Sequence, residues 1–322
     1  MLRIPVLAAL LSLACCGAAA GVPQPGTAVD QTASPTPAGC LTPPPVAPGE
    51  TATQTLTSGG QQRSYLVHVP ASYRNTELTP LILAFHGSGE SDTQIESYSD
   101  LSALDAIVLY PEGTTGTNGE TSWEGAPYSS GADDVRFVED LLDRTQQQFC
   151  VDQGRIYATG KSNGGGFTAL LACQLPSRIA AFAPVAGAYY PETTQGCPTS
   201  PPVPMLEFHG TADPVIHYDG GTSHGEQYPS ITQWLGTWTE KDQCPAGSRR
   251  SIGSDVVEFD WTPCAQGTEV THYQVIGGGH TWPGAVAPSG PGHTTQTISA
   301  TAVMWDFFTR HPLNRPTRPG GR

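Results

Sequence analysis

Apolar residues follow two different patterns along the chain, and both predict β-strands. Residues 62–69 alternate apolar and polar side chains, which is typical of a strand with one face toward solvent. Residues 81–85 form a continuous apolar run, which is typical of a parallel strand covered on both faces. Further strands are predicted at residues 106–110, 155–159, 181–186, 205–208 and 270–276.

Longer segments repeat their apolar residues at helical spacing. Residues 133–148 place four apolar side chains on one helical face: Val135, Val138, Leu141 and Leu142. This segment begins with Asp133 and Asp134, whose charges complement the helix dipole. Helices are also predicted at residues 165–174, 230–241 and 298–308. Strands that alternate with helices predict an α/β fold, with a doubly wound, mostly parallel sheet and helices on both faces.

The first twenty residues have the layout of a secretory signal peptide. A positive charge at Arg3 precedes an apolar run at residues 4–13, and small residues follow as far as Ala20. The run is too short for a permanent membrane anchor, so we expect no membrane partner. A lipoprotein site at Cys15 is the alternative, but the residues before it fit that motif poorly. We expect residues 1–20 to be removed and the mature protein to be secreted outside the cell.

The mature chain is expected to contain one packed domain between two extended ends. Residues 21–48 are rich in Pro, Thr and Ala, and this composition predicts a linker that buries no core. Residues 314–322 predict a disordered tail. Residues 49–313 are enough for one α/β catalytic domain with a sizeable core. We expect this domain to act as a monomer.

Charge and cysteine content narrow the choice of partners. A formal net charge of −14 provides no basic face for phosphates, so we expect no nucleic-acid partner. Cysteines beyond the signal segment are even in number, which in a secreted chain predicts disulfides without fixing their pairing. His209, Asp213 and His217 are spaced by four residues, but a glycine and a proline interrupt any helix there. We therefore expect neither a metal nor another cofactor.

Gly160-Lys161-Ser162-Asn163-Gly164 is the most informative motif of the chain. It is a G-x-S-x-G sequence between the strand predicted at 155–159 and the helix predicted at 165–174. In α/β-hydrolases this motif forms the nucleophile elbow, a strained turn that projects the serine hydroxyl from the sheet. An ordinary Gly/Ser loop is the alternative. The position of the motif predicts an α/β-hydrolase fold with Ser162 as the nucleophile.

A serine nucleophile needs a base and an acid, which follow it in this fold in the order Asp/Glu, then His. Asp213 comes just after a predicted strand, at the edge where catalytic groups gather, and is the expected acid. Asp219 and Glu207 are its alternatives. His280 follows three glycines after the last predicted strand and is the expected base, with His293 as its alternative.

Two backbone N–H groups are expected to form an oxyanion hole for the tetrahedral intermediate. One belongs to Asn163, the residue directly after the nucleophile. The other is assigned to Ser88, in the loop after the strand at residues 81–85. A simple turn is the alternative interpretation of that loop.

Six segments in register resemble the secreted esterases of carbohydrate esterase family 1, which include polyhydroxybutyrate depolymerases and feruloyl esterases. They lie at residues 83–87, 110–113, 133–137, 155–165, 209–213 and 277–284. The resemblance covers about residues 63–308 and implies a triad of Ser162, Asp213 and His280. It also implies the disulfides Cys173–Cys197 and Cys244–Cys264, which leave Cys40 to pair with Cys150. Family members often have Met where this chain has Lys161 and Gly166-Phe167, so the resemblance does not define the acyl pocket.

The resemblance and the predicted secretion imply a serine esterase that acts on plant cell-wall polysaccharide, with feruloyl (hydroxycinnamoyl) esters expected first. Acetyl-xylan and polyhydroxyalkanoate esters are the alternatives. Trp123 and Trp282 lie in loops near the predicted site, where indole rings either stack on a substrate or pack in the core. A non-catalytic carbohydrate-binding protein is the alternative of another class, but such proteins normally lose a triad member that this chain retains.

Overall fold

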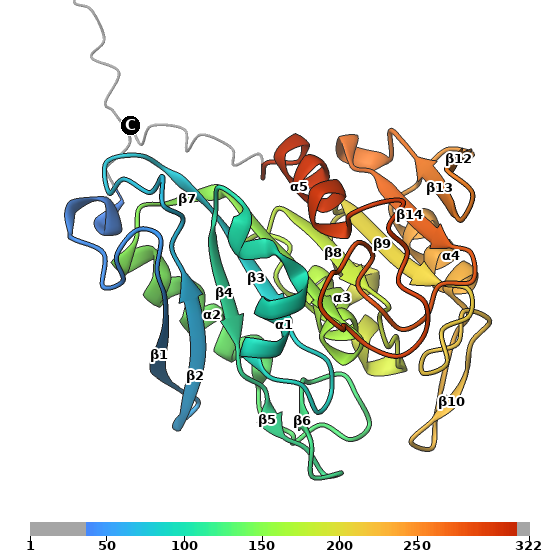
Figure 1. The fold of residues 1–322 in the computed structure, drawn as a ribbon, viewed down its shortest axis with the longest axis horizontal. Coiled ribbons are helices and arrows are strands. Elements are labelled where there is room, and N and C mark those ends of the chain that lie inside the picture. Colours follow the sequence, from blue (N-terminus) through green and yellow to red (C-terminus); the bar gives the residue numbers. More distant parts are fainter. Residues whose placement is uncertain (1–36, 314–322) are drawn as a thin grey trace, which may run out of the picture. The chain divides into compact units, whose positions relative to one another are not determined.

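A ten-stranded sheet forms the centre of the structure, a computed structural model that describes residues 37–313 (Figure 1). The strands run across the sheet in the order β1-β2-β4-β3-β7-β8-β9-β14-β13-β12. Their bounds are β1 Thr51–Ser58, β2 Gln61–His68, β3 Thr79–Phe85, β4 Ile107–Pro111, β7 Val151–Lys161, β8 Ala181–Val185, β9 Met205–Gly210, β12 Ser248–Ile252, β13 Val256–Trp261 and β14 Val270–Val275. Two short hairpins lie outside this sheet: β5 Thr114–Thr115 with β6 Thr121–Ser122, and β10 Gly221–Ser223 with β11 Glu226–Tyr228.

The central strands β4, β3, β7, β8, β9 and β14 are parallel to their neighbours in this stretch of the sheet. Antiparallel strands extend it at both edges, β1 and β2 on one side and β13 and β12 on the other. Parallel strands need crossover connections, and helices supply most of them here. The predicted α/β-hydrolase fold, with a mostly parallel doubly wound sheet, is confirmed.

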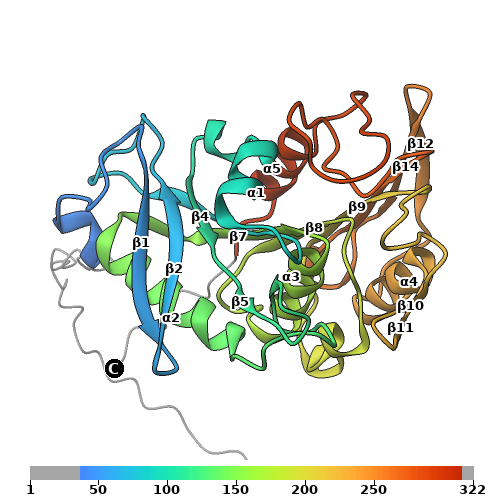
Figure 2. The ribbon, with the colours of Figure 1, turned by 60° about the horizontal axis from the view of Figure 1, so that its bottom comes forward.

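Five α-helices among the described residues cover the two faces of the sheet. They are α1 Asp92–Ser99, α2 Asp134–Gln148, α3 Asn163–Gln174, α4 Ile231–Lys241 and α5 Ala300–Arg310. Figure 2 shows α1 and α5 on one face and α2, α3 and α4 on the other. Four of them begin at a Ser or Asp whose side chain accepts a backbone N–H of the first turn: Ser91, Asp133, Ser230 and Ser299. Short 3₁₀ turns lie at η1 Ala38–Leu41, η2 Leu101–Ala103, η3 Pro191–Thr194, η4 Cys197–Thr199 and η5 Ala265–Gly267.

The sheet separates two hydrophobic cores, and strand β3 contributes to both. Leu81, Leu83 and Phe85 pack in the core beneath α2, α3 and α4. Ile82 and Ala84 point to the opposite face, in the core beneath α1 and α5. All five side chains are fully buried. The continuous apolar run therefore reflects a strand with helices on both faces, as predicted.

Strand β2 differs from its prediction as a strand with one solvent-exposed face. It lies second in the sheet between β1 and β4, and not at an edge. Leu66 is buried along with Tyr65 and Val67, because Leu66 packs in the core that includes Ile95 of helix α1. The prediction that this face of the strand is exposed to solvent is therefore wrong at Leu66.

The structure also describes the last part of the predicted linker. Residues 37–48 carry η1, the disulfide partner Cys40 and the buried Val46, so the packed domain begins before residue 49. The predicted signal segment, the start of the linker and the tail lie outside the described residues. Within residues 37–313, no helix is long and apolar enough to cross a membrane.

Candidate active site

Ser162 occupies the sharp turn between the end of β7 and the start of α3. Its backbone has φ 58° and ψ −121°, a combination that residues other than glycine rarely adopt. The turn is held by Ser162 N–H, which donates to Val185 O (3.0 Å), and by Ala188 N–H, which donates to Ser162 O (2.9 Å). Strain of this kind persists where the surrounding structure determines it, and it is frequent at active sites.

The two glycines of the motif permit this turn through close packing. A Cβ atom on Gly160 would lie 2.4 Å from Gly164 O, and one on Gly164 would lie 2.2 Å from Phe85 O. Both distances are far below van der Waals contact, so no other residue fits at either position without a shift of the backbone. The G-x-S-x-G spacing is therefore required by the packing of β7, α3 and β3.

Asp213 and His280 lie beyond the carboxyl ends of β9 and β14, the edge of the sheet at which β7 ends in the elbow. His280 Nδ1 donates to Asp213 Oδ2 across 2.7 Å, and both side chains are buried. Asp213 Oδ1 accepts the N–H groups of Val215 (2.8 Å) and Ile216 (2.9 Å), so the carboxylate is held at both oxygens. The donor role of Nδ1 leaves Nε2 of His280 free to act as a base.

Burial and hydrogen bonding set the protonation of this pair. Burial alone raises the pKa of Asp213, but the hydrogen bond and charge of His280 outweigh it and lower the pKa below the ordinary value. Burial lowers the pKa of His280, and the bond to Asp213 opposes this only in part. At neutral pH the pair is therefore an ionised carboxylate beside a neutral imidazole.

The predicted oxyanion donors lie beside Ser162. A Cβ on Gly87, the residue before Ser88, would be 3.3 Å from the Ser162 Cβ, so the loop after β3 lies against the nucleophile. Within residues 37–313, neither Ser88 N–H nor Asn163 N–H is bonded to a protein acceptor. Nor does a hydrogen bond join Ser162 to His280 in this part of the chain, a contact that often forms only with substrate bound.

Trp123 and Trp282 do not support the substrate-stacking role considered for them. Trp123 is fully buried, stacks on Phe167 at 5.4 Å and donates its indole N–H to His86 O. Trp282 is 1% exposed and donates its indole N–H to Thr301 Oγ1 (3.0 Å). Because neither ring has a free face, both are packing residues, and Trp123 braces the loop that carries Ser88.

A fully buried acid–base cluster behind Asp213 has no counterpart in the sequence-based prediction. Glu207 lies in β9 and was considered only as an alternative acid. Its Oε1 lies 3.0 Å from His209 Nδ1, and its Oε2 lies 2.6 Å from His272 Nδ1. His209 Nε2 donates to Ile216 O (2.9 Å) and lies 3.5 Å from Asp213 Oδ2. The cluster thus connects the core to the predicted catalytic acid.

Both ring nitrogens of His209 face acceptors, which determines its charge. A carbonyl oxygen only accepts, so Nε2 must carry a proton, and the Glu207 carboxylate accepts a second one from Nδ1. Burial lowers the pKa of His209, but the hydrogen bond and charge of Glu207 outweigh burial and raise it. Below this raised pKa, His209 is a buried imidazolium between two carboxylates. Within residues 37–313, no group of three or more His, Cys, Asp or Glu side chains is arranged as a metal site.

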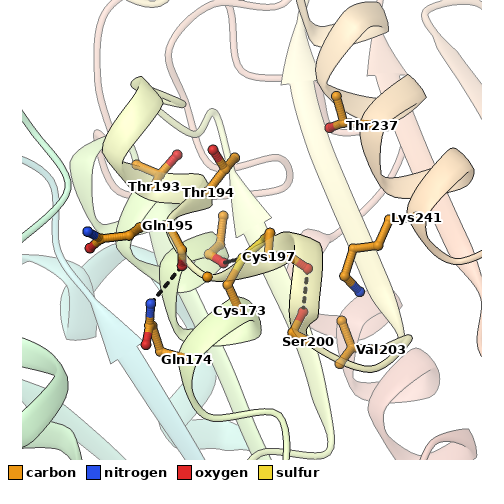
Figure 3. Close-up of a disulfide and its surroundings, with 12 residues drawn as sticks. Cys173, Gln174, Thr193, Thr194, Gln195, Cys197, Ser200, Val203, Thr237 and Lys241 are labelled. Atoms are coloured by element: carbon orange, nitrogen blue, oxygen red, sulfur yellow. Dashed lines mark hydrogen bonds between the residues drawn. A yellow bond between two sulfur atoms is a disulfide. The ribbon is translucent and has the colours of Figure 1, made fainter.

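The structure contains Cys40–Cys150, the pair that was left over, and the two disulfides that the resemblance implied, Cys173–Cys197 and Cys244–Cys264. Figure 3 shows the second of them, which joins the end of helix α3 to η4. Beside it, Gln174 Nε2 donates to Gln195 O (2.7 Å). Both contacts hold the far end of the helix that begins at the nucleophile elbow.

Comparisons with known proteins agree with this geometry. Feruloyl esterase B of Piromyces equi is 33% identical over 230 residues, which are 68% of this chain and 42% of that protein. This chain thus spans less than half the length of that relative. A putative esterase of Nocardia uniformis subsp. tsuyamanensis, NocK, is 30% identical over 336 residues. The alignment covers 94% of this chain and 96% of that protein.

A solved structure shows that the fold is shared, and a family model identifies the chain. An acetyl xylan esterase from Aspergillus awamori superposes with a TM-score of 0.52, covering 80% of this chain and 99% of that one at 14% identity. Residues 63–234, more than half of the chain, match the family model described as esterase PHB depolymerase. The chain therefore belongs to the esterase PHB depolymerase family, as its motifs predicted.

Proposed function

We propose that the protein is a secreted serine esterase that hydrolyses carboxylic esters through an acyl-enzyme. The observation that carries this proposal is the strained elbow at Ser162 at the same edge of the sheet as the buried Asp213–His280 pair. A neutral imidazole held by a carboxylate is the base that a serine hydroxyl needs at neutral pH. The signal segment predicted at residues 1–20 supports secretion.

The roles of the residues follow from their positions. Ser162 Oγ attacks the ester carbonyl while His280 Nε2 accepts its proton, and Asp213 stabilises the imidazolium that forms. The N–H groups of Ser88 and Asn163 donate to the oxyanion of the tetrahedral intermediate. His280 then protonates the leaving alcohol, and afterwards activates the water molecule that releases the acid from Ser162.

We propose feruloyl esters of plant cell-wall polysaccharide as the substrate. The support is the similarity to the feruloyl esterase of Piromyces equi, which covers 68% of this chain. Substrate class is tested by comparing kcat/KM on methyl ferulate, p-nitrophenyl acetate and acetylated xylan. Ferulate release at a kcat/KM above about 10⁴ M⁻¹s⁻¹ supports the proposal, since typical enzymes reach that value on their own substrates. Release of acetate alone would assign the enzyme to acetylated xylan or short aliphatic esters instead.

Activity should rise with pH along an acid limb whose midpoint lies below 6.5. His280 accepts a proton only when neutral, and burial lowers its pKa from the ordinary value of 6.5. The enzyme therefore loses activity as the pH falls through this lowered pKa. The check is kcat/KM on p-nitrophenyl acetate between pH 4 and 8, since the free-enzyme pKa appears in that ratio. A midpoint at or above about 7 would contradict the assignment of His280 as a buried, neutral base.

A further inference from the structure

Lys161, directly before the nucleophile, is a buried cation. Its side chain is 2% exposed and ends in an ion pair with Glu90 Oε1. The ammonium also lies 5.3 Å from the centre of the Tyr98 ring. Burial of an ammonium group is unfavourable unless it is paired, and even a paired one is often no more stable than an apolar side chain of similar size. Stability is therefore a weak explanation for Lys161, and its neighbours indicate another.

Glu90 connects this cation to the loop that bears Ser88. Its second oxygen, Oε2, accepts the N–H of Gly87 (3.0 Å) and the hydroxyl of Tyr98 (2.8 Å). One carboxylate thus joins the residue before the nucleophile to the peptide group before Gly87. Tyr98 belongs to helix α1, which covers the face of the sheet that it shares with α5 (Figure 2).

The next peptide group, between Gly87 and Ser88, is held through its carbonyl. Gly87 O accepts from His86 Nδ1 (2.7 Å) and from Glu90 N–H (3.1 Å). His86 Nε2 in turn accepts the N–H of Gly113 (3.0 Å), so this imidazole is neutral with its proton on Nδ1. Burial lowers the pKa of His86 to about 4, in agreement with that state. A trans peptide directs its N–H opposite to its C=O, so the direction of Gly87 O sets the direction of Ser88 N–H.

We propose that Lys161 and Glu90 form a positioning pair that holds the Ser88 N–H in place to donate to the oxyanion. The pair acts through Gly87, whose position beside Ser162 brings the Ser88 N–H to the reacting carbonyl. This inference rests on the proposed function, because it assigns a role within ester hydrolysis. The role assigned to both side chains is to orient this N–H, and no contact with the substrate is assigned to either of them.

Lys161 also borders the loop that carries His280. A Cβ on Gly290 would lie 2.0 Å from His280 O and 3.4 Å from Lys161 Nζ, so the ammonium lies near the backbone of the base. The charged or titratable groups that act on His280 are Asp213, Lys161 and His209. Lys161 opposes protonation of His280, since like charges repel. Loss of this cation should therefore move the acid limb of kcat/KM to higher pH.

The experiment is a double-mutant cycle of wild type, Lys161→Met, Glu90→Gln and the double variant. Each single change should lower kcat on p-nitrophenyl acetate by about 10- to 100-fold, the range expected when a transition-state donor is misplaced. KM should change less than about threefold, because the donor contributes mainly in the transition state. The double variant should lose no more than the worse single variant, since both changes break one contact. Lys161→Met alone should also shift the acid limb upward.

Arg178 and Asp143 supply a matched control, an ion pair of 2.7 Å on the surface. Arg178→Met and Asp143→Asn should leave kcat and the pH profile unchanged. Glu90→Gln keeps the shape of the Glu90 side chain and decides the matter if Lys161→Met does not fold. A wild-type kcat in folded Glu90→Gln would overturn the inference. Additive losses in the cycle would also overturn it. A wild type that is labelled by a fluorophosphonate yet hydrolyses no ester would instead contradict the proposed function, and labelling rates of the four proteins would then decide the positioning role.

Discussion

Ser162→Ala should lower kcat/KM on p-nitrophenyl acetate by on the order of 10³-fold or more, as removal of the nucleophile does in other triad enzymes. The loss should fall on kcat, because the hydroxyl forms the bond that breaks in each turnover. Stability should change little. Alanine keeps the Cβ of serine, so the strain at φ 58° is the same in both proteins. The melting temperature should shift by less than about 2 °C, which corresponds to about 1 kcal/mol or less in a domain of this size.

Fluorophosphonate labelling gives a second measurement of the same residue. Wild type should be labelled at Ser162 and the variant should not, because only an activated serine reacts. Ser254→Ala, at an exposed turn position between β12 and β13, is the matched control and should retain full activity and labelling. The expected loss in kcat/KM is on the order of 10³-fold. A Ser162→Ala protein that retains about a tenth or more of the wild-type kcat/KM would therefore exclude Ser162 as the nucleophile.

The central strands could be predicted because a strand buried on both faces has a continuous run of apolar residues. Residues 81–85 are apolar without interruption, and the structure places them in β3 with helices on both sides. The edge strands could not be predicted in this way. Residues 248–252 read Ser-Arg-Arg-Ser-Ile, and four of the five are exposed in β12. Such a strand has no buried stripe, and its position depends on pairing with β13.

In the site, too, residues marked by local motifs could be predicted, and contacts that depend on tertiary packing could not. Ser162, Asp213 and His280 were predicted because local motifs and chain order carry the information. The stacking role of Trp123 failed because burial of a loop residue depends on tertiary packing that a motif does not contain. The pairing of Lys161 with Glu90 was not predicted either. The two are 71 residues apart, and their contact depends on β3 and β7 being neighbours.

Glu207→Gln should destabilise the folded protein by about 3–5 kcal/mol near pH 6, because it removes one partner of a buried ion pair. The remaining imidazolium of His209 would lie in the core without the Glu207 carboxylate, and only Asp213, 3.5 Å from Nε2, would stay near it. Urea unfolding followed by tryptophan fluorescence measures this difference. Asp143→Asn is the matched control, since its carboxylate is 62% exposed and a surface pair contributes about 1 kcal/mol or less.

The pH dependence of that stability should identify the ion pair as the cause. The pKa of Glu207 is lowered: burial raises it, but the hydrogen bond from His209 and the close contact with His272 outweigh burial. Its contribution is therefore present above the unfolded pKa of about 4.3 and is lost as the pH falls through the lower folded value. The pKa of His209 is raised, so its contribution is complete below the unfolded value of about 6.5 and is lost as the pH rises through the folded value. Wild type should thus exceed Glu207→Gln most between about pH 4.5 and 6.5, and an equal difference at pH 5 and pH 9 would contradict an imidazolium at His209.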